Sequence, residues 1–133
     1  MTQKLSGSME DYLETIYLLG KKRKVVRVRD IAKEMAITMP SVTGALKTLE
    51  QLKLVSHPRY DMVFLTSKGN RLARAVYQRH FVLKSFLVNV LGIDPKIAES
   101  DACGMEHAVS PQTLERLVLF MKSMNNHERE TYG

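Results

Sequence analysis

The order of apolar patterns along residues 8–66 is the feature that most restricts the fold of this chain. Segments with apolar residues at helical spacing come first, at 8–20, 29–36 and 39–53. Two short runs rich in strand-forming residues follow at 54–56 and 62–65, and the Pro and Asp between them suit a turn. Helix, helix, helix and a two-stranded wing is the order of a winged helix-turn-helix, so we predict that fold.

Residues that begin helices support these segments. Ser8 is a candidate N-cap of the first helix, with Asp11 in the capping-box position three residues later. Pro40 suits the first turn of the third helix, because the N–H that proline lacks would have no partner there. The short stretch 26–28 is expected to be extended and to lead into the second helix.

The second half of the chain reads as three further helices. A long helix capped by Thr66 or Ser67 runs to about Val90, and two more begin at the Asp-Pro and Ser-Pro pairs at 94–95 and 110–111. The polar residues 125–133 are expected to fray. We predict a mainly α fold, with a winged-helix domain at 1–70 linked by the long helix to a helical domain at 71–133.

Charge is unevenly distributed along the chain. Residues 1–75 carry 14 Lys or Arg and 7 Asp or Glu, whereas residues 76–133 carry 6 and 7. This asymmetry indicates that a polyanion binds the first half, although a solvated basic surface without a partner has the same composition.

Cysteine content and hydropathy limit the location of the protein. Cys103 is the only cysteine, so no internal disulfide can form, which is typical of a reducing cytoplasm. No apolar run approaches the roughly 20 residues that span a bilayer. We therefore expect a cytoplasmic protein with no membrane partner.

In a winged helix, the helix at 39–53 places its first turns at the base edges of the major groove. Gly44 is costly there by roughly 1 kcal/mol relative to alanine, which indicates that DNA or a neighbouring helix comes close to it. A domain that contacts only protein is the alternative, and the basic charge favours DNA. The candidate DNA contacts are Met39, Pro40, Ser41, Thr43, Gly44 and Lys47 on this helix, with Arg27, Arg29 and Arg59 for phosphates.

Candidate metal ligands fall into three groups. The first helix has two carboxylates three residues apart, the long helix has a histidine, and the fifth helix has a thiol, a carboxylate and an imidazole at i, i+3 and i+4. Helical spacing of this kind brings donors together without strain. Taken singly, each group also has an ordinary structural explanation. The six residues are Asp11, Glu14, His80, Cys103, Glu106 and His107.

Several short motifs point to one family. They are Ser-Met-Glu-Asp-Tyr-Leu-Glu at 8–14, Val-Arg-Asp-Ile-Ala at 28–32, Pro-Ser-Val-Thr at 40–43, Leu-Thr-Ser-Lys-Gly at 65–69, Arg-His at 79–80 and Cys-Gly-Met-Glu-His at 103–107. Over roughly residues 7–125 the chain resembles the diphtheria toxin repressor family of iron- and manganese-dependent transcriptional regulators. The resemblance implies a non-enzymatic repressor that binds palindromic operator DNA as a homodimer when metal is bound, and that controls metal-uptake genes.

The resemblance also implies where the metal binds, at the junction of the DNA-binding and dimerisation regions. By position, one metal is surrounded by Asp11, Cys103, Glu106 and His107. A second metal close to it is held by Glu14 and His80, with Glu106 bridging the two.

Two positions depart from the branches of this family. Manganese-type members have a carboxylate at the position of Cys103, and iron-type members have a methionine at the position of Asp11. Mn²⁺ and Fe²⁺ are therefore both candidates, with Co²⁺ and Zn²⁺ further candidates in vitro. An ancillary site of the iron branch has a carboxylate at Lys84 and a histidine at Glu99, so we expect that site to be absent here. The length resembles the short two-domain form, as in the manganese transport regulators.

Two other functions are compatible with parts of this pattern. A winged-helix regulator could answer to a small molecule or to oxidation of Cys103 instead of metal. A metal-dependent hydrolase would use the same donors, but no nucleophile motif accompanies them and the chain is small for a substrate pocket.

Apolar residues that form either the dimer interface or the intrachain core are Phe86, Leu87, Val90, Leu114, Leu117 and Phe120.

Overall fold

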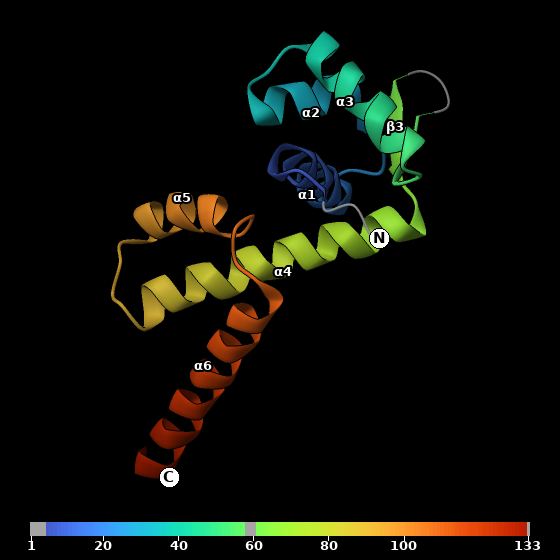
Figure 1. The fold of residues 1–133 in the computed structure, drawn as a ribbon. Coiled ribbons are helices and arrows are strands. Elements are labelled where there is room, and N and C mark those ends of the chain that lie inside the picture. Colours follow the sequence, from blue (N-terminus) through green and yellow to red (C-terminus); the bar gives the residue numbers. More distant parts are fainter. Residues whose placement is uncertain (1–4, 58–60, 133) are drawn as a thin grey trace. The chain divides into compact units, whose positions relative to one another are not determined.

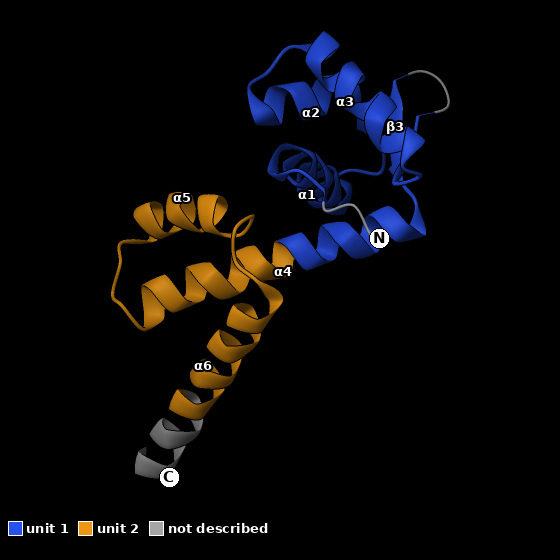
Figure 2. Cartoon of the chain, viewed as in Figure 1, with its two compact units in different colours: residues 1–76 blue, residues 77–133 orange. Residues whose placement is uncertain are grey.

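The computed structural model describes residues 5–57 and 61–132, with side chains described through Met124. The chain forms two compact units, residues 1–76 and 77–133 (Figure 2). The long helix α4 (Ser67–Asn89) passes from the first unit into the second, as its continuous ribbon shows (Figure 1).

Unit 1 is the predicted winged helix-turn-helix. Its buried core is built from the apolar stripes of its helices, and Leu13, Ile31, Leu46 and Leu49 are each completely buried. The elements before α4 are α1 (Gly7–Lys22), β1 (Val26–Arg27), α2 (Val28–Met35), α3 (Met39–Gln51), β2 (Val55–Ser56) and β3 (Met62–Leu65).

The wing contains a third strand in addition to the predicted pair. β3 lies between β1 and β2 and pairs antiparallel with both. Val26 lies opposite Val63 in one ladder, and Val55 lies opposite Leu65 in the other. The extended stretch expected before the second helix is therefore part of the sheet, and it ties the start of α2 to the wing.

Local hydrogen bonds place the helix starts slightly differently from the sequence prediction. The N-cap of α1 is Ser6, whose Oγ accepts from the Met9 N–H at 3.2 Å, so the prediction of Ser8 is wrong. Thr38 caps α3 by accepting from the Ser41 N–H, and proline lies in the first turn as predicted. Side-chain oxygens at these positions satisfy N–H groups that have no partner within the helix.

The start of α4 is fixed by Thr66 and Gly69. Thr66 Oγ1 accepts from the Gly69 N–H at 3.0 Å and donates to the Lys53 carbonyl at 2.7 Å. A Cβ atom at Gly69 would lie 1.9 Å from the Leu54 carbonyl oxygen, so only glycine allows this approach of the helix to the backbone just before β2. Of the two predicted caps, Thr66 is the one used.

Unit 2 consists of the second part of α4 with α5 (Pro95–Met105) and α6 (Pro111–Tyr132). Its buried apolar residues include Leu83, Leu87, Ala98 and Ala102. Gly92, at φ +68°, allows the turn between α4 and α5. The α6 backbone continues to Tyr132, past the point where the sequence predicted fraying.

Candidate metal centre and DNA-binding surface

The first turns of α3 form an exposed surface on a helix whose opposite face is anchored in the core. Val42, Ala45, Leu46 and Leu49 are buried, which fixes the orientation of the helix in unit 1. Thr43 is half-buried, and its hydroxyl donates to the Met39 carbonyl at 3.1 Å. The exposed candidates for DNA contact are Met39, Pro40, Ser41, Gly44 and Lys47.

The other basic candidates differ in exposure. Arg29 is exposed near the start of α2, whereas Arg27 is half-buried in β1 and its backbone N–H donates to Asp30 Oδ2 at 2.9 Å. Asp30 also forms an ion pair with Arg23 at 3.4 Å. Arg59 lies outside the described residues. Of the two described arginines that are candidates for phosphate contact, Arg29 is therefore exposed and Arg27 is part of the sheet.

His80 is the centre of the donor cluster in unit 2. It is only 7% exposed, and each ring nitrogen faces a carboxylate. Nδ1 lies 2.8 Å from Glu106 Oε2, and Nε2 lies 3.0 Å from Glu99 Oε1. Glu106 is itself 1% exposed, and its other oxygen lies 3.4 Å from His107 Nε2. One buried carboxylate therefore contacts two imidazoles.

Cys103 and Glu99 extend this cluster along α5. Cys103 Sγ lies 3.8 Å from His80 Nδ1, and Cys103 is exposed. One ring nitrogen of His80, one oxygen of Glu99 and Sγ of Cys103 all lie within 4.8 Å of one another. Sequence reasoning missed Glu99 as a donor, although its position four residues before Cys103 on the same helix was a usable signal.

Glu99 is also paired with Lys84. Lys84 Nζ lies 2.9 Å from Glu99 Oε2. The Lys84 ammonium, and to a smaller extent the His80 ring, hold the pKa of the Glu99 carboxyl below its ordinary value, against the opposing effect of partial burial. Glu99 is therefore a carboxylate at neutral pH and can act as an oxygen donor.

The remaining predicted ligands occupy different local structures. The sequence placed Glu106 and His107 on the fifth helix, but α5 ends at Met105, so these two residues lie in the turn that follows. Asp11 and Glu14 lie on α1 in unit 1, where Asp11 is exposed and Glu14 is half-buried. The structure thus gathers His80, Cys103 and Glu106 within one unit.

The donor set of unit 2 fits a divalent transition-metal ion. Imidazole nitrogen, carboxylate oxygen and thiolate sulfur are the ligands that such ions take in proteins. Glu106 is a deeply buried carboxylate that contacts two imidazoles, and a buried carboxylate is stabilised by hydrogen bonds or positive charge around it, which a metal ion would add to.

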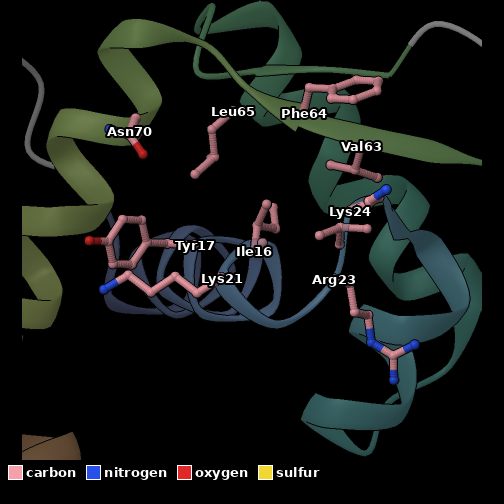
Figure 3. Close-up of a pocket in the computed structure, with 11 residues that line it drawn as sticks. Ile16, Tyr17, Lys21, Arg23, Lys24, Val63, Phe64, Leu65 and Asn70 are labelled. Atoms are coloured by element: carbon pink, nitrogen blue, oxygen red, sulfur yellow. The ribbon is translucent and has the colours of Figure 1, made fainter.

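A cavity of about 270 Å³ in unit 1 is a different kind of site (Figure 3). Ile16 of α1 and Leu65 of β3 point toward one another across it, and Lys21 and Lys24 are among the residues that line it. None of the described residues that line it is a His, Cys, Asp or Glu. This cavity is therefore not the metal centre.

In the described part of the chain, no helix combines the length and the apolar character needed to cross a bilayer.

Two adjoining segments of the chain match the two domains of one protein family. Residues 4–63 match the iron dependent repressor N-terminal DNA binding domain. Residues 66–131 match the iron dependent repressor metal binding and dimerisation domain. The two matches together cover nearly the whole chain.

Two curated transcriptional regulators are similar to this chain over most of their own length. An uncharacterized HTH-type transcriptional regulator of Methanocaldococcus jannaschii is 39% identical over 123 residues, which are 92% of this chain and 98% of that protein. The HTH-type transcriptional regulator MntR of Listeria monocytogenes serotype 4a is 34% identical over 120 residues, covering 90% of this chain and 84% of that protein.

Solved structures have the same fold. The manganese regulator SloR has a TM-score of 0.77 at 32% identity, covering 92% of this chain and 55% of that chain. A manganese-dependent transcriptional repressor in complex with manganese has a TM-score of 0.74 at 29% identity, covering 82% and 50%. The chain therefore spans about half the length of these two structures.

Proposed function

The chain belongs to the family of iron-dependent repressors, and from this premise we propose that it represses transcription by binding palindromic operator DNA as a metal-loaded homodimer. The family consists of transcriptional regulators, so the protein is not an enzyme. The observation that carries the proposal is the buried pairing of His80 with Glu106 in unit 2, because it joins metal-type donors at the core of the matched metal-binding domain. We further propose that the regulated genes serve metal uptake and that the protein acts in the cytoplasm.

The recognition surface is the exposed beginning of α3. Ser41 and Thr43 offer hydroxyl oxygens to base edges or phosphates, and Lys47 offers a cation to guanine or phosphate. Pro40 and Met39 offer apolar contact to thymine methyl groups. Arg27, Arg29 and Arg59 contribute positive charge for the phosphate backbone, which makes the affinity depend on salt.

The proposed metal ligands come from both units. Asp11, Cys103, Glu106 and His107 bind one ion, and Glu14 and His80 bind a second, with Glu106 shared. Without metal, the clustered carboxylates repel one another and the two units can move independently. When bound, the metal supplies positive charge that attracts the ligand atoms of both α1 and unit 2.

A switch follows from this division of ligands. Metal binds more tightly to the arrangement in which both units contribute donors, so it shifts the population toward that arrangement. In a homodimer, that arrangement fixes the separation of the two α3 helices. Half-sites about 34 Å apart, or at a multiple of that spacing, can then be contacted together. Without metal the separation varies and the operator is bound weakly.

The chemistry of the donors favours Mn²⁺ or Fe²⁺ as the regulatory metal. Asp11, Glu14 and Glu106 are hard oxygen donors that suit both ions, while the thiol of Cys103 suits Fe²⁺ better than Mn²⁺. Co²⁺ and Zn²⁺ also fit a site that contains thiolate and imidazole, and we expect both to bind in vitro.

A selection of binding sites from random DNA tests this proposal. Purified protein is incubated anaerobically with Mn²⁺, with Fe²⁺ and with a chelator, and the bound DNA is sequenced. Enrichment of one palindrome in the metal arms alone is the expected result, and the stronger arm identifies the regulatory metal. Equal enrichment with the chelator would show that metal is not the switch.

Matched variants connect this result to the proposed ligands. Glu106→Gln removes the charge of the shared carboxylate while keeping its size, and it should abolish metal-dependent enrichment. Asp101→Asn makes the same change at an exposed position of α5 that has no proposed role, and it should leave enrichment intact. Failure of both variants would indicate a folding defect, which circular dichroism would reveal.

A further inference from the structure

Unit 2 contains three donors of different chemistry that need no ligand from unit 1. They come from two helices: His80 from α4, and Glu99 and Cys103 from α5. One donor atom from each residue lies within 4.8 Å of the others. A tetrahedral ion with metal–ligand bonds of about 2.0–2.3 Å needs donors roughly 3.5 Å apart, so small side-chain rotations would close the site.

The two nitrogens of His80 have different roles in this arrangement. Nδ1 is held at 2.8 Å by Glu106 Oε2, a carboxylate that is itself buried. Nε2 faces Glu99 Oε1 at 3.0 Å, on the side of the helix pair where Glu99 is half-exposed. A carboxylate that accepts from one ring nitrogen of a histidine orients the other nitrogen toward a metal. Nε2 is therefore the ligand atom, and Glu106 positions the ring.

The chemical character of the three donors selects the kind of cation. Thiolate and imidazole prefer borderline ions such as Zn²⁺ and Co²⁺, whereas Mn²⁺ prefers oxygen ligands. Cys103 is exposed, so an ion can reach its sulfur from solvent. The thiol releases its proton to solvent as the metal–sulfur bond forms.

Lys84 opposes this binding. Its ammonium lies 2.9 Å from Glu99 Oε2 and would be close to any cation bound at Oε1. A like charge at that distance weakens cation binding, and the ion pair must rearrange when the metal arrives. Lys84 therefore sets the affinity of the site below that of the same three donors alone.

We propose that His80 Nε2, Glu99 and Cys103 form a binding site for a thiophilic divalent cation that lies entirely within unit 2. Because His80 and Cys103 are also ligands in the proposed regulatory centre, a cation bound here withdraws them from that centre without engaging Asp11 or Glu14. The protein then discriminates between metals by where they bind. The competition rests on the proposed function, but the existence of the site does not.

Co²⁺ binding to the full-length, reduced protein tests the site by absorption spectroscopy. A thiolate bound to Co²⁺ gives a near-ultraviolet charge-transfer band, and tetrahedral Co²⁺ gives strong visible bands. Both should appear in the unaltered protein. They should persist in the double variant Asp11→Asn with Glu14→Gln, because neither residue belongs to the site.

Substitutions of Glu99 and Lys84 in unit 2, unlike those in α1, should change the affinity for Co²⁺. Glu99→Gln should weaken the Co²⁺ affinity by at least about tenfold, a loss typical of removing one partner of a metal site. Asp101→Asn is the matched control on the same helix and should have no effect. Lys84→Gln should tighten Co²⁺ binding, because it removes the neighbouring positive charge while leaving all three donors.

The outcomes separate this proposal from the regulatory one. Loss of the charge-transfer band in the Asp11/Glu14 variant, with no effect of Glu99→Gln, would assign the thiolate to a centre shared between units and overturn the unit 2 site. Absence of the band in the unaltered protein would overturn it as well. Operator binding with Mn²⁺, measured in parallel, tests the regulatory proposal without reference to Co²⁺.

The competition has a separate readout in the same DNA assay. One equivalent of Zn²⁺, added before Mn²⁺, should suppress operator binding by the unaltered protein and suppress it less in Glu99→Gln. Equal suppression in both proteins would overturn the competition while leaving the spectroscopic result to decide the site.

Discussion

At the scale of single residues, Gly44 is the position where stability and DNA binding are expected to conflict. A Cβ atom built there meets no described atom of the chain within 4 Å, so packing against a neighbouring helix does not explain the glycine. Gly44→Ala should raise the free energy of unfolding by about 1 kcal/mol through helix propensity. It should also weaken metal-dependent operator binding, because the added methyl group projects from the proposed recognition surface.

Urea unfolding and fluorescence anisotropy with labelled operator measure the two effects of Gly44→Ala. Gly20→Ala is the control, because Gly20 is also helical and also has open space around it, but lies on α1. It should stabilise the protein without changing operator affinity. Unchanged operator binding by Gly44→Ala would contradict the placement of this turn against DNA.

Gly69 is a glycine of the opposite kind. Its missing side chain is required by the backbone of Leu54, whose carbonyl oxygen would lie 1.9 Å from a Cβ atom. Gly69→Ala must move either the start of α4 or the backbone of Leu54, and backbone shifts forced by overpacking cost about 1–3 kcal/mol. Thermal unfolding should show a lower Tm than for Gly20→Ala, and a Tm equal to that of the unaltered protein would contradict the close approach.

At the scale of secondary-structure elements, Thr66 joins α4 to the end of α3. Its hydroxyl accepts from the Gly69 N–H and donates to the Lys53 carbonyl. Thr66→Val keeps the shape but removes both bonds, and it should destabilise the protein by about 1–2 kcal/mol. Thr66→Ser retains the hydroxyl and should recover most of that loss in urea unfolding. Destabilisation by Thr66→Ser with none by Thr66→Val would show that the methyl group, not the hydrogen bonding, matters.

The helices of unit 1 could be predicted from the sequence because the core requires a periodic apolar stripe. What the sequence could not provide was set by contacts between distant residues. A two-residue strand at Val26 has no periodicity of its own, and only its pairing with Val63 makes it part of the sheet. The caps show the same limit, since Ser6 and Ser8 are chemically alike and the backbone geometry decides between them.

The metal donors could be predicted as residue types but not as neighbours. The spacing of Cys103, Glu106 and His107 indicated a metal-type group, yet it placed all three on one helix, and α5 ends at Met105. The sequence predicts that the family's ancillary site is absent, because Lys84 and Glu99 stand where that site has a carboxylate and a histidine. In the structure that lysine pairs with Glu99, while Glu99 also faces His80. Proximity across two helices depends on how α4 and α5 pack, and local sequence does not encode that.

At the scale of the whole molecule, the charge asymmetry makes operator binding sensitive to salt. Each phosphate contact adds to the slope of log affinity against log salt concentration. If Lys47 contacts phosphate, Lys47→Ala should reduce the slope by about 1 for each copy in the dimer and weaken all sequences alike. If it reads guanine, the slope should change little and sequence preference should relax. Lys122→Ala, on α6, is the control and should change neither.

We propose that two copies associate through apolar side chains that unit 2 leaves exposed. Leu87 is buried and belongs to the intrachain core, whereas Leu119 and Phe120 of α6 are each about half exposed. Phe120 packs edge to face on Phe86, so changing it would also disturb the fold. Leu119 is the cleaner probe, because it is exposed and apolar on a helix within the matched dimerisation domain.

Leu119→Glu should therefore raise the Kd of dimerisation by at least about tenfold, the effect of roughly 1.4 kcal/mol, because a carboxylate would be buried against the second copy. Gln112→Glu makes the same change of charge at an exposed position nearer the start of α6, and it should leave the dimer intact. Sedimentation velocity over a range of concentrations measures both. Operator affinity should fall together with the dimer, because one subunit contacts only one half-site. A Leu119→Glu protein that stays dimeric would place the interface on another part of unit 2.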